Sequence, residues 1–165
     1  MRLAYADPPY VGQAKKRYGK EASYAGEVDH AALFLQLVEY DGWALSASSP
    51  SLPFLFKLAP SDVRVAAWVK PFAIFKPGVN PAYAWEPVLF KPARSGKART
   101  GGPTIRDWVS ANITLKRGLC GVKPEAFCLW LFDLLGAESG DTLDDLFPGT
   151  GAVSAAWVKR WIQAQ

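Results

Sequence analysis

The chain has 165 residues, of which 50% are hydrophobic and 21% are charged. This length and composition fit one domain with a buried core, and they exclude a wholly disordered chain or a low-complexity scaffold. The 19 Lys and Arg residues outnumber the 15 Asp and Glu residues, which gives a net charge of +4. This mild excess is compatible with a polyanionic partner and equally with an ordinary basic surface. We expect a single domain over residues 1–165.

Metal and membrane sites are excluded by what the sequence lacks. Two cysteines, Cys120 and Cys128, and one histidine, His30, are too few for a zinc cluster or a disulfide framework. No apolar run approaches the roughly 20 residues of a membrane helix, and residues 1–7 contain no signal-peptide core. We therefore expect a cytoplasmic protein without a metal.

The first third of the chain predicts a strand, a loop and a helix. Residues 2–6 form a short strand, which the prolines after Asp7 end because they lack amide donors. The polar segment 11–26 predicts a surface loop. Asp29 is a candidate N-cap for a helix that Gly42 ends. Three apolar residues of this helix share one face: Leu33, Leu37 and Tyr40.

The middle of the chain continues the alternation of strands and helices. Strands are expected at 43–47, 63–69 and 82–90, with a helix at 50–58 between the first two. Residues 91–106 contain five basic residues and no acidic one. Together with its glycines, this composition predicts an exposed basic loop.

The last third predicts a helix, a strand and a second helix. The first helix covers 123–135 and ends at Gly136, and the strand covers 141–147. A tight turn at 148–151 leads into a helix at 152–163. Alternating strands and helices are the pattern of an α/β sheet.

Asp7-Pro8-Pro9-Tyr10 is the first motif that suggests chemistry. Ligands of open α/β sheets bind beyond the carboxyl ends of the strands, where this turn is expected. The Asp7 carboxylate and the Pro8 carbonyl can both accept hydrogen bonds from one NH2 group, and the Tyr10 ring can stack on a base. A simple strand-ending turn is the structural alternative.

The second motif, residues 145–151, reads Asp-Leu-Phe-Pro-Gly-Thr-Gly between a strand and a helix. Its glycines let the backbone approach a ligand, and the free amides at a helix start favour a carboxylate or a phosphate. The motif lacks the third glycine of a dinucleotide fingerprint and the Gly-Lys-Ser/Thr of a Walker loop.

Together, the two motifs resemble those of S-adenosylmethionine (SAM)-dependent DNA amino-methyltransferases, which methylate adenine N6 or cytosine N4. The catalytic motif comes first and the cofactor turn last, as in the circularly permuted class, and the chain resembles a small phage- or prophage-like form of these enzymes. The helix beginning at Lys123-Pro124-Glu125 is similar to the cofactor-side helix of that class. Trp68-Val69-Lys70 and Trp85-Glu86-Pro87 resemble the hairpin strands near the target base.

The resemblance implies a shortened, permuted class I (Rossmann-like) methyltransferase sheet with flanking helices, because no further strand pattern follows the last helix before Gln165. It also implies SAM as the cofactor and Asp7 chemistry directed at adenine N6. The implied catalytic residues are Asp7, Pro8, Pro9 and Tyr10. The implied cofactor-binding residues are Ala6, Asp7, Lys123, Asp145, Phe147, Pro148, Gly149 and Gly151.

DNA is the expected partner, with RNA as an alternative. Residues 91–118 form the expected recognition-type loop, whose cations would contact phosphates. The candidate nucleic-acid-binding residues are Lys15, Lys16, Arg17, Tyr18, Lys70, Arg94, Lys97 and Arg99. A solvated basic surface is the alternative interpretation of these clusters.

Two other functions stay open at this stage. A methyltransferase-like protein that binds nucleic acid without turnover would carry the same motifs, and so would an RNA adenine-N6 methyltransferase. A homodimer is expected only from the general frequency of twofold assemblies and from the short sheet. We read both cysteines as core residues, which argues against cytosine-C5 chemistry.

Overall fold

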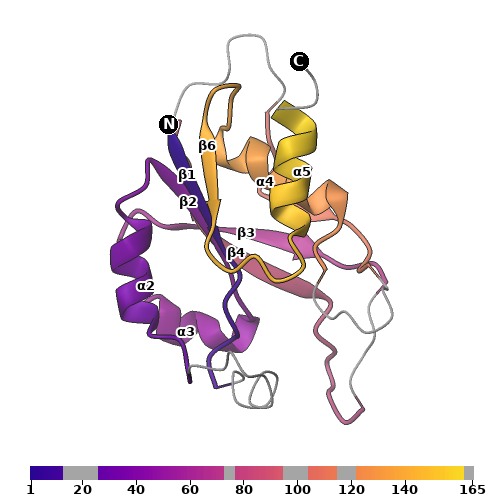
Figure 1. Ribbon diagram of the computed structural model, residues 1–165. Coiled ribbons are helices and arrows are strands. Elements are labelled where there is room, and N and C mark those ends of the chain that lie inside the picture. Colours follow the sequence, from indigo (N-terminus) through magenta and orange to yellow (C-terminus); the bar gives the residue numbers. More distant parts are fainter. Residues whose placement is uncertain (13–25, 73–76, 95–103, 115–121, 162–165) are drawn as a thin grey trace.

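The computed structural model describes residues 1–12, 26–72, 77–94, 104–114 and 122–161. It consists of a six-stranded mixed sheet with helices on both faces (Figure 1). The expected α/β class is therefore confirmed. The strands are β1 (Arg2–Ala6), β2 (Gly42–Ser46), β3 (Arg64–Val69), β4 (Trp85–Lys91), β5 (Trp108–Ser110) and β6 (Thr142–Asp145).

The strand order is β5-β3-β4-β2-β1-β6. β1 runs parallel to both β2 and β6, and β3 runs parallel to β5. β4 runs antiparallel to its two neighbours, β2 and β3. The other five strands therefore end at one edge of the sheet, which we call the carboxyl edge, and β4 begins there. The opposite edge is called the amino edge.

Two apolar clusters fill the space between the sheet and its helices. α4 (Glu125–Leu135) and α5 (Ala152–Trp161) pack on one face, where Leu3 and Tyr5 point. α2 (His30–Leu37) and α3 (Leu52–Leu55) pack on the other face, where Ala4 and Ala6 point. The two helix pairs lie on opposite sides of the sheet in Figure 1. This alternation along β1 follows from the two-residue period of a strand.

The caps of two helices agree with the sequence. The Asp29 carboxylate accepts hydrogen bonds from the amides of Ala31 and Ala32 at 2.9 and 3.0 Å, as an N-cap does. Gly136 ends α4 in the left-handed conformation, with φ of 72°.

The expected end of the first helix was wrong. α2 ends at Leu37 with Val38 as its C-cap, so Tyr40 lies beyond the helix and its hydroxyl donates to Asp144 at 2.7 Å. Gly42 is instead the first residue of β2 and is buried. A Cβ atom at this position would lie 2.5 Å from the backbone nitrogen of Ala93. The glycine is needed for this close approach of two backbones.

We expect Gly42→Ala to destabilise the fold because the methyl group would press on the backbone of Ala93. Overpacking of this kind costs about 1–3 kcal/mol. Urea unfolding followed by circular dichroism would measure the loss. A free energy of unfolding equal to that of the wild type would show that the segment after β4 gives way without cost.

β5 is a strand that the sequence analysis did not predict, within the expected recognition-type loop at 91–118. It has only three residues and pairs with β3 as an outermost strand of the sheet. The expected helix at 50–58 is instead a 3-10 turn (Ser49–Ser51) followed by the short α3. In the part of the chain that the structure describes, no helix has the length and apolar character to cross a membrane.

Candidate active site

The two sequence motifs meet at the carboxyl edge. Asp7 follows the last residue of β1, and the glycine-containing turn follows β6. β1 and β6 are adjacent and parallel, with Tyr5 opposite Asp145. The Leu146 amide also donates to the Tyr5 carbonyl at 2.9 Å, which extends the pairing into the turn. Segments from the two ends of the sequence thus build one site.

A chain of alternating charges runs through this site. The Lys123 ammonium lies 3.1 Å from Asp7 Oδ2 and 3.2 Å from Glu86 Oε2. The other carboxylate oxygen of Glu86 binds the Lys70 ammonium. Lys123 precedes α4, Glu86 lies in β4, and Lys70 directly follows β3. Three separate segments therefore position the Asp7 carboxylate.

Because this row of charged side chains is shielded from water, the pKa of each group depends on the charges of its neighbours. The side chain of Lys123 is 6% exposed, and that of Asp7 is 24% exposed. Burial alone would lower the Lys123 pKa, but the charges of Asp7 and Glu86 outweigh it and hold the pKa well above its usual range.

The pKa values of the two carboxyl groups in this charge chain, Asp7 and Glu86, shift in opposite directions. Burial raises the pKa of Asp7, although the Lys123 ammonium opposes the rise. Burial would also raise the pKa of Glu86, but the ammonium groups of Lys123 and Lys70 lower it overall. Glu86 is thus held ionised more firmly than Asp7, because two cations contact it and not one.

Aromatic rings lie beside both lysines of this charge chain. The Lys123 ammonium lies 5.2 Å from the ring centre of Trp68 and 5.5 Å from that of Phe127. The Lys70 ammonium lies 4.5 Å from the Trp68 ring centre. Ring faces attract cations and exclude water, so they fix both ammonium groups in place.

Pro8 and Tyr10 border a narrow crevice beyond the ends of β1 and β2. Its other walls include His30, Ser46 and Leu55. Burial raises the Tyr10 pKa well above its usual range, so the ring remains neutral. The single histidine is buried, and its Nδ1 lies 2.9 Å from the Val28 carbonyl oxygen.

The glycine turn exposes backbone in a conformation that side chains avoid. Gly149 and Gly151 have φ values of 48° and 73°, and no heavy atom lies within 4 Å of a Cβ built at Gly151. Pro148 is exposed and Phe147 is half-buried. Ala6 is buried in the core, so its backbone alone could face a ligand.

Asp145 contributes a carboxylate to the start of this turn. Its Oδ2 accepts a hydrogen bond from the Ser154 hydroxyl at 3.1 Å. Its Oδ1 is buried and has no hydrogen-bond partner among the described residues. Burial raises the Asp145 pKa, although the Ser154 hydroxyl opposes the rise. An additional donor would therefore satisfy this oxygen.

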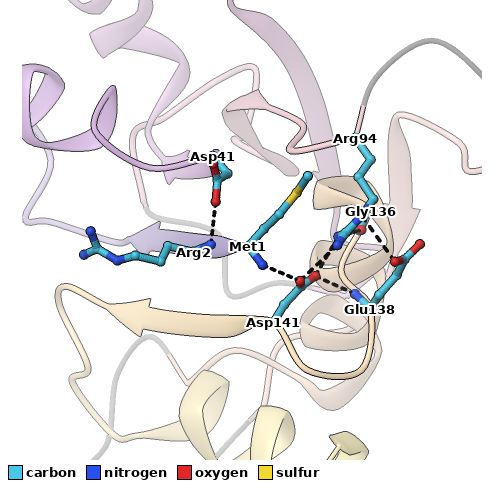
Figure 2. Close-up of polar contacts among 7 residues, drawn as sticks. All are labelled: Met1, Arg2, Asp41, Arg94, Gly136, Glu138 and Asp141. Atoms are coloured by element: carbon cyan, nitrogen blue, oxygen red, sulfur yellow. Dashed lines mark hydrogen bonds and ion pairs between the residues drawn. The ribbon is translucent and has the colours of Figure 1, made fainter.

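The expected nucleic-acid contacts are placed unevenly. Lys70 lies at the carboxyl edge, where it pairs with Glu86. Arg94 lies at the amino edge, where its guanidinium binds Asp141 at 2.6 and 3.0 Å and the Gly136 carbonyl at 2.8 Å (Figure 2). We therefore assign Arg94 to the folded framework, away from the candidate site. The rest of this set lies outside the described residues: Lys15, Lys16, Arg17, Tyr18, Lys97 and Arg99.

Glu86 is the site residue that sequence reasoning did not single out. Its Trp85-Glu86-Pro87 segment was expected near the target base, but the pairing of Glu86 with Lys123 depends on contacts between distant segments. The available signal was a lone acidic residue within the otherwise apolar segment 82–90, where a strand was expected. Cys128 is fully buried, and burial raises the pKa of its thiol to about 12, so the thiol stays protonated.

Comparisons with known proteins place this geometry in a known fold. No protein-family model and no curated protein sequence matches the chain. The crystal structure of the M1.HpyAVI–SAM complex matches with a TM-score of 0.58 over 94% of this chain and 75% of that chain, at 15% sequence identity. The chain shares the fold of M1.HpyAVI. The expected Rossmann-like sheet with flanking helices is thereby confirmed.

Proposed function

We propose that this protein transfers the methyl group of SAM to an exocyclic amino group in DNA, namely N6 of adenine. The observation that carries the proposal is the meeting of Asp7-Pro8-Pro9-Tyr10 and the glycine turn on the adjacent, parallel strands β1 and β6. Its fold likeness to M1.HpyAVI, whose structure is a complex with SAM, supports the choice of cofactor.

The residues of the glycine turn fit the methionine part of SAM, which carries an ammonium and a carboxylate. The unpartnered Oδ1 of Asp145 is an acceptor suited to the ammonium. The first amides of α5, a helix of ten residues, are donors suited to the carboxylate. The open space at Gly151 leaves room for the ligand.

Asp7 and Pro8 would hold the target amine. The Asp7 carboxylate and the Pro8 carbonyl accept one hydrogen bond each from the NH2 group, which aims the nitrogen lone pair at the donor carbon. SAM supplies an electrophilic methyl group on a sulfonium, and the amine is the nucleophile. The Tyr10 ring stacks on the base, and Lys123 favours the ionised Asp7 that the hydrogen bond requires.

The strand order supports a circularly permuted arrangement of the motifs. The catalytic turn belongs to the first strand and the cofactor turn to the last, yet the two strands are neighbours. The proposed role of DNA also fits the net charge of +4.

Nucleoside mass spectrometry tests the proposal directly. The wild-type chain, Asp7→Ala and the control Asp62→Ala would be expressed in a bacterial host that lacks adenine methylation. Asp62 is an exposed carboxylate in an ion pair with Lys91, outside the site. We expect N6-methyladenine in DNA with the wild type and with Asp62→Ala, and none with Asp7→Ala.

The other outcomes separate the alternatives. Methylated adenine in RNA alone would identify the RNA methyltransferase. No methylated base, combined with retained DNA binding, would indicate a nucleic-acid-binding protein without turnover. Product at wild-type levels from Asp7→Ala would refute the role assigned to Asp7.

A further inference from the structure

Two exposed tryptophans lie on one face of the sheet. Trp85 on β4 is 40% exposed, and Trp108 on β5 is 44% exposed. Trp85 pairs with Val69 and Trp108 pairs with Ala67, so these four side chains project from the same side of the sheet. We call this surface, with these four residues, the tryptophan face.

The tryptophan face continues the side of the sheet on which α2 and α3 pack. Leu89, which is on the same side of β4, is fully buried in that helix layer. Trp85 and Val69 lie farther along the paired strands toward the carboxyl edge and are exposed. Among the described elements, no helix covers them. Large apolar side chains left together on a surface mark a binding site.

The chemistry of this face fits unpaired bases. Flat rings bind bases by stacking, and a neighbouring cation attracts the phosphates. The Arg106 guanidinium lies 5.5 Å from the Trp108 ring centre. The two tryptophans are separated by two inter-strand spacings and two residues along the strands, which amounts to about 12 Å. Consecutive bases of an extended strand can bridge such a distance, whereas a duplex keeps its base faces stacked inside.

The tryptophan face also begins beside the candidate site. Trp85 is followed directly by Glu86, whose carboxylate binds the lysine that contacts Asp7. Because successive strand residues point to opposite faces, Trp85 and Glu86 flank the same point of the carboxyl edge. A single DNA strand with one base at Asp7 would therefore pass over this edge toward Trp85.

We propose that the tryptophan face, together with Arg106, binds unpaired bases of single-stranded DNA that flank the target nucleotide. This inference rests on the proposed function and names the form of its substrate. The bases stack on Trp85 and Trp108, Ala67 and Val69 form a flat floor between the rings, and Arg106 contacts the phosphates.

Oligonucleotide affinity tests this inference without any turnover. Fluorescence anisotropy would compare a labelled single-stranded DNA with its duplex, for the wild type, Trp85→Leu and Trp108→Leu. Leucine keeps the apolar character but removes the flat ring. Each substitution should weaken single-strand binding roughly fivefold to a hundredfold. The salt dependence of binding should stay unchanged, because the substitution removes contacts to bases and none to phosphates. Trp85→Phe and Trp108→Phe should restore most of the affinity.

Controls distinguish stacking from other roles of the face. Val158→Ala removes an exposed apolar side chain from α5, in the helix layer on the opposite face, and should bind like the wild type. Equal affinity of wild type and Trp108→Leu, or preference of the wild type for duplex, would overturn the inference. So would a dimer by light scattering that both leucine variants convert to monomer, because a second copy of the chain would then cover the rings.

This result is independent of the methylation test. Tryptophan-dependent binding of single strands without any methylated product would retain the face and remove the proposed function. N6-methyladenine in DNA, together with unchanged binding by both leucine variants, would do the reverse.

Discussion

Replacing Lys123 by alanine is expected to reduce methyl transfer at neutral pH by about 100-fold or more, the usual cost of removing an electrostatic partner from an active site. Without the ammonium, Asp7 and Glu86 are two partly buried carboxylates of like charge, and Asp7 loses the cation that contacts it. Burial already raises the pKa of Asp7, and losing Lys123 raises it further. A protonated Asp7 then no longer accepts the hydrogen bond from the amine.

The pH dependence of activity shows in which direction the Asp7 pKa has moved. In the proposed reaction Asp7 accepts a hydrogen bond in its ionised form, so activity should rise with pH, and Lys123→Ala should shift that rise to higher pH than in the wild type. The same substitution should lower the free energy of unfolding by about 3 kcal/mol, because it removes the cation that contacts Asp7, whereas Glu86 keeps Lys70. Initial rates across pH and urea unfolding would measure the two effects.

Lys159→Ala is the matched control. Lys159 also pairs with a carboxylate, Glu125 at 2.6 Å, but its side chain is 67% exposed. Exposed pairs contribute about 1 kcal/mol or less, so activity and stability should stay close to wild type. A Lys123→Ala variant with the wild-type pH profile would contradict the role given to Lys123.

Asp141→Asn is expected to lower the free energy of unfolding by about 3 kcal/mol, the scale for removing one partner of a buried ion pair. The Asp141 side chain is 3% exposed. It accepts hydrogen bonds from the Met1 ammonium at 2.7 Å, from the Arg94 guanidinium and from the Glu138 amide at 2.8 Å (Figure 2). Asparagine cannot compensate these cations.

The pH dependence of this loss follows from the Asp141 pKa. Hydrogen bonds from Arg94 hold the pKa well below its usual range. The stabilisation is therefore complete above the unfolded pKa of about 4 and declines as pH falls toward the folded pKa. The difference between wild type and Asp141→Asn should be largest at neutral pH and shrink in acid.

Glu138→Gln is the control for Asp141. Its carboxylate also contacts Arg94, at 3.3 Å, but the side chain is 51% exposed. We expect a change of about 0.5 kcal/mol or less in unfolding experiments at neutral pH. Equal losses in both variants would mean that burial of Asp141 adds nothing to the pair.

Features that depend on neighbouring residues could be predicted from the sequence. Asp29 caps α2 and Gly136 ends α4 because capping involves only atoms of the next few residues. The turn after β1 was likewise readable from Pro8 and Pro9. For the same reason both motifs could be placed at strand ends, whereas their position on the adjacent strands β1 and β6 is a finding of the structure.

Features that depend on distant residues could not be predicted. A glycine after a helical pattern, such as Gly42, is typical of a helix end. Its role here is instead set by Ala93, which approaches it closely from the segment after β4. Arg94 belongs to a basic stretch, yet its partner Asp141 lies at the amino edge. β5 is too short for a periodic pattern. Glu86 acquires its role through two distant segments, the end of the paired strand β3, after which Lys70 follows, and the segment before α4 that carries Lys123.

The pairing of β1 with β6 has a consequence for how the protein is made. The strand pair joins residues 140 positions apart, the same separation as between Met1 and Asp141. During synthesis, β1 therefore emerges long before β6 exists to pair with it. Closing so large a loop is an entropic cost that slows folding. The two halves of the candidate site assemble only at this late step, so activity would report complete folding of the chain.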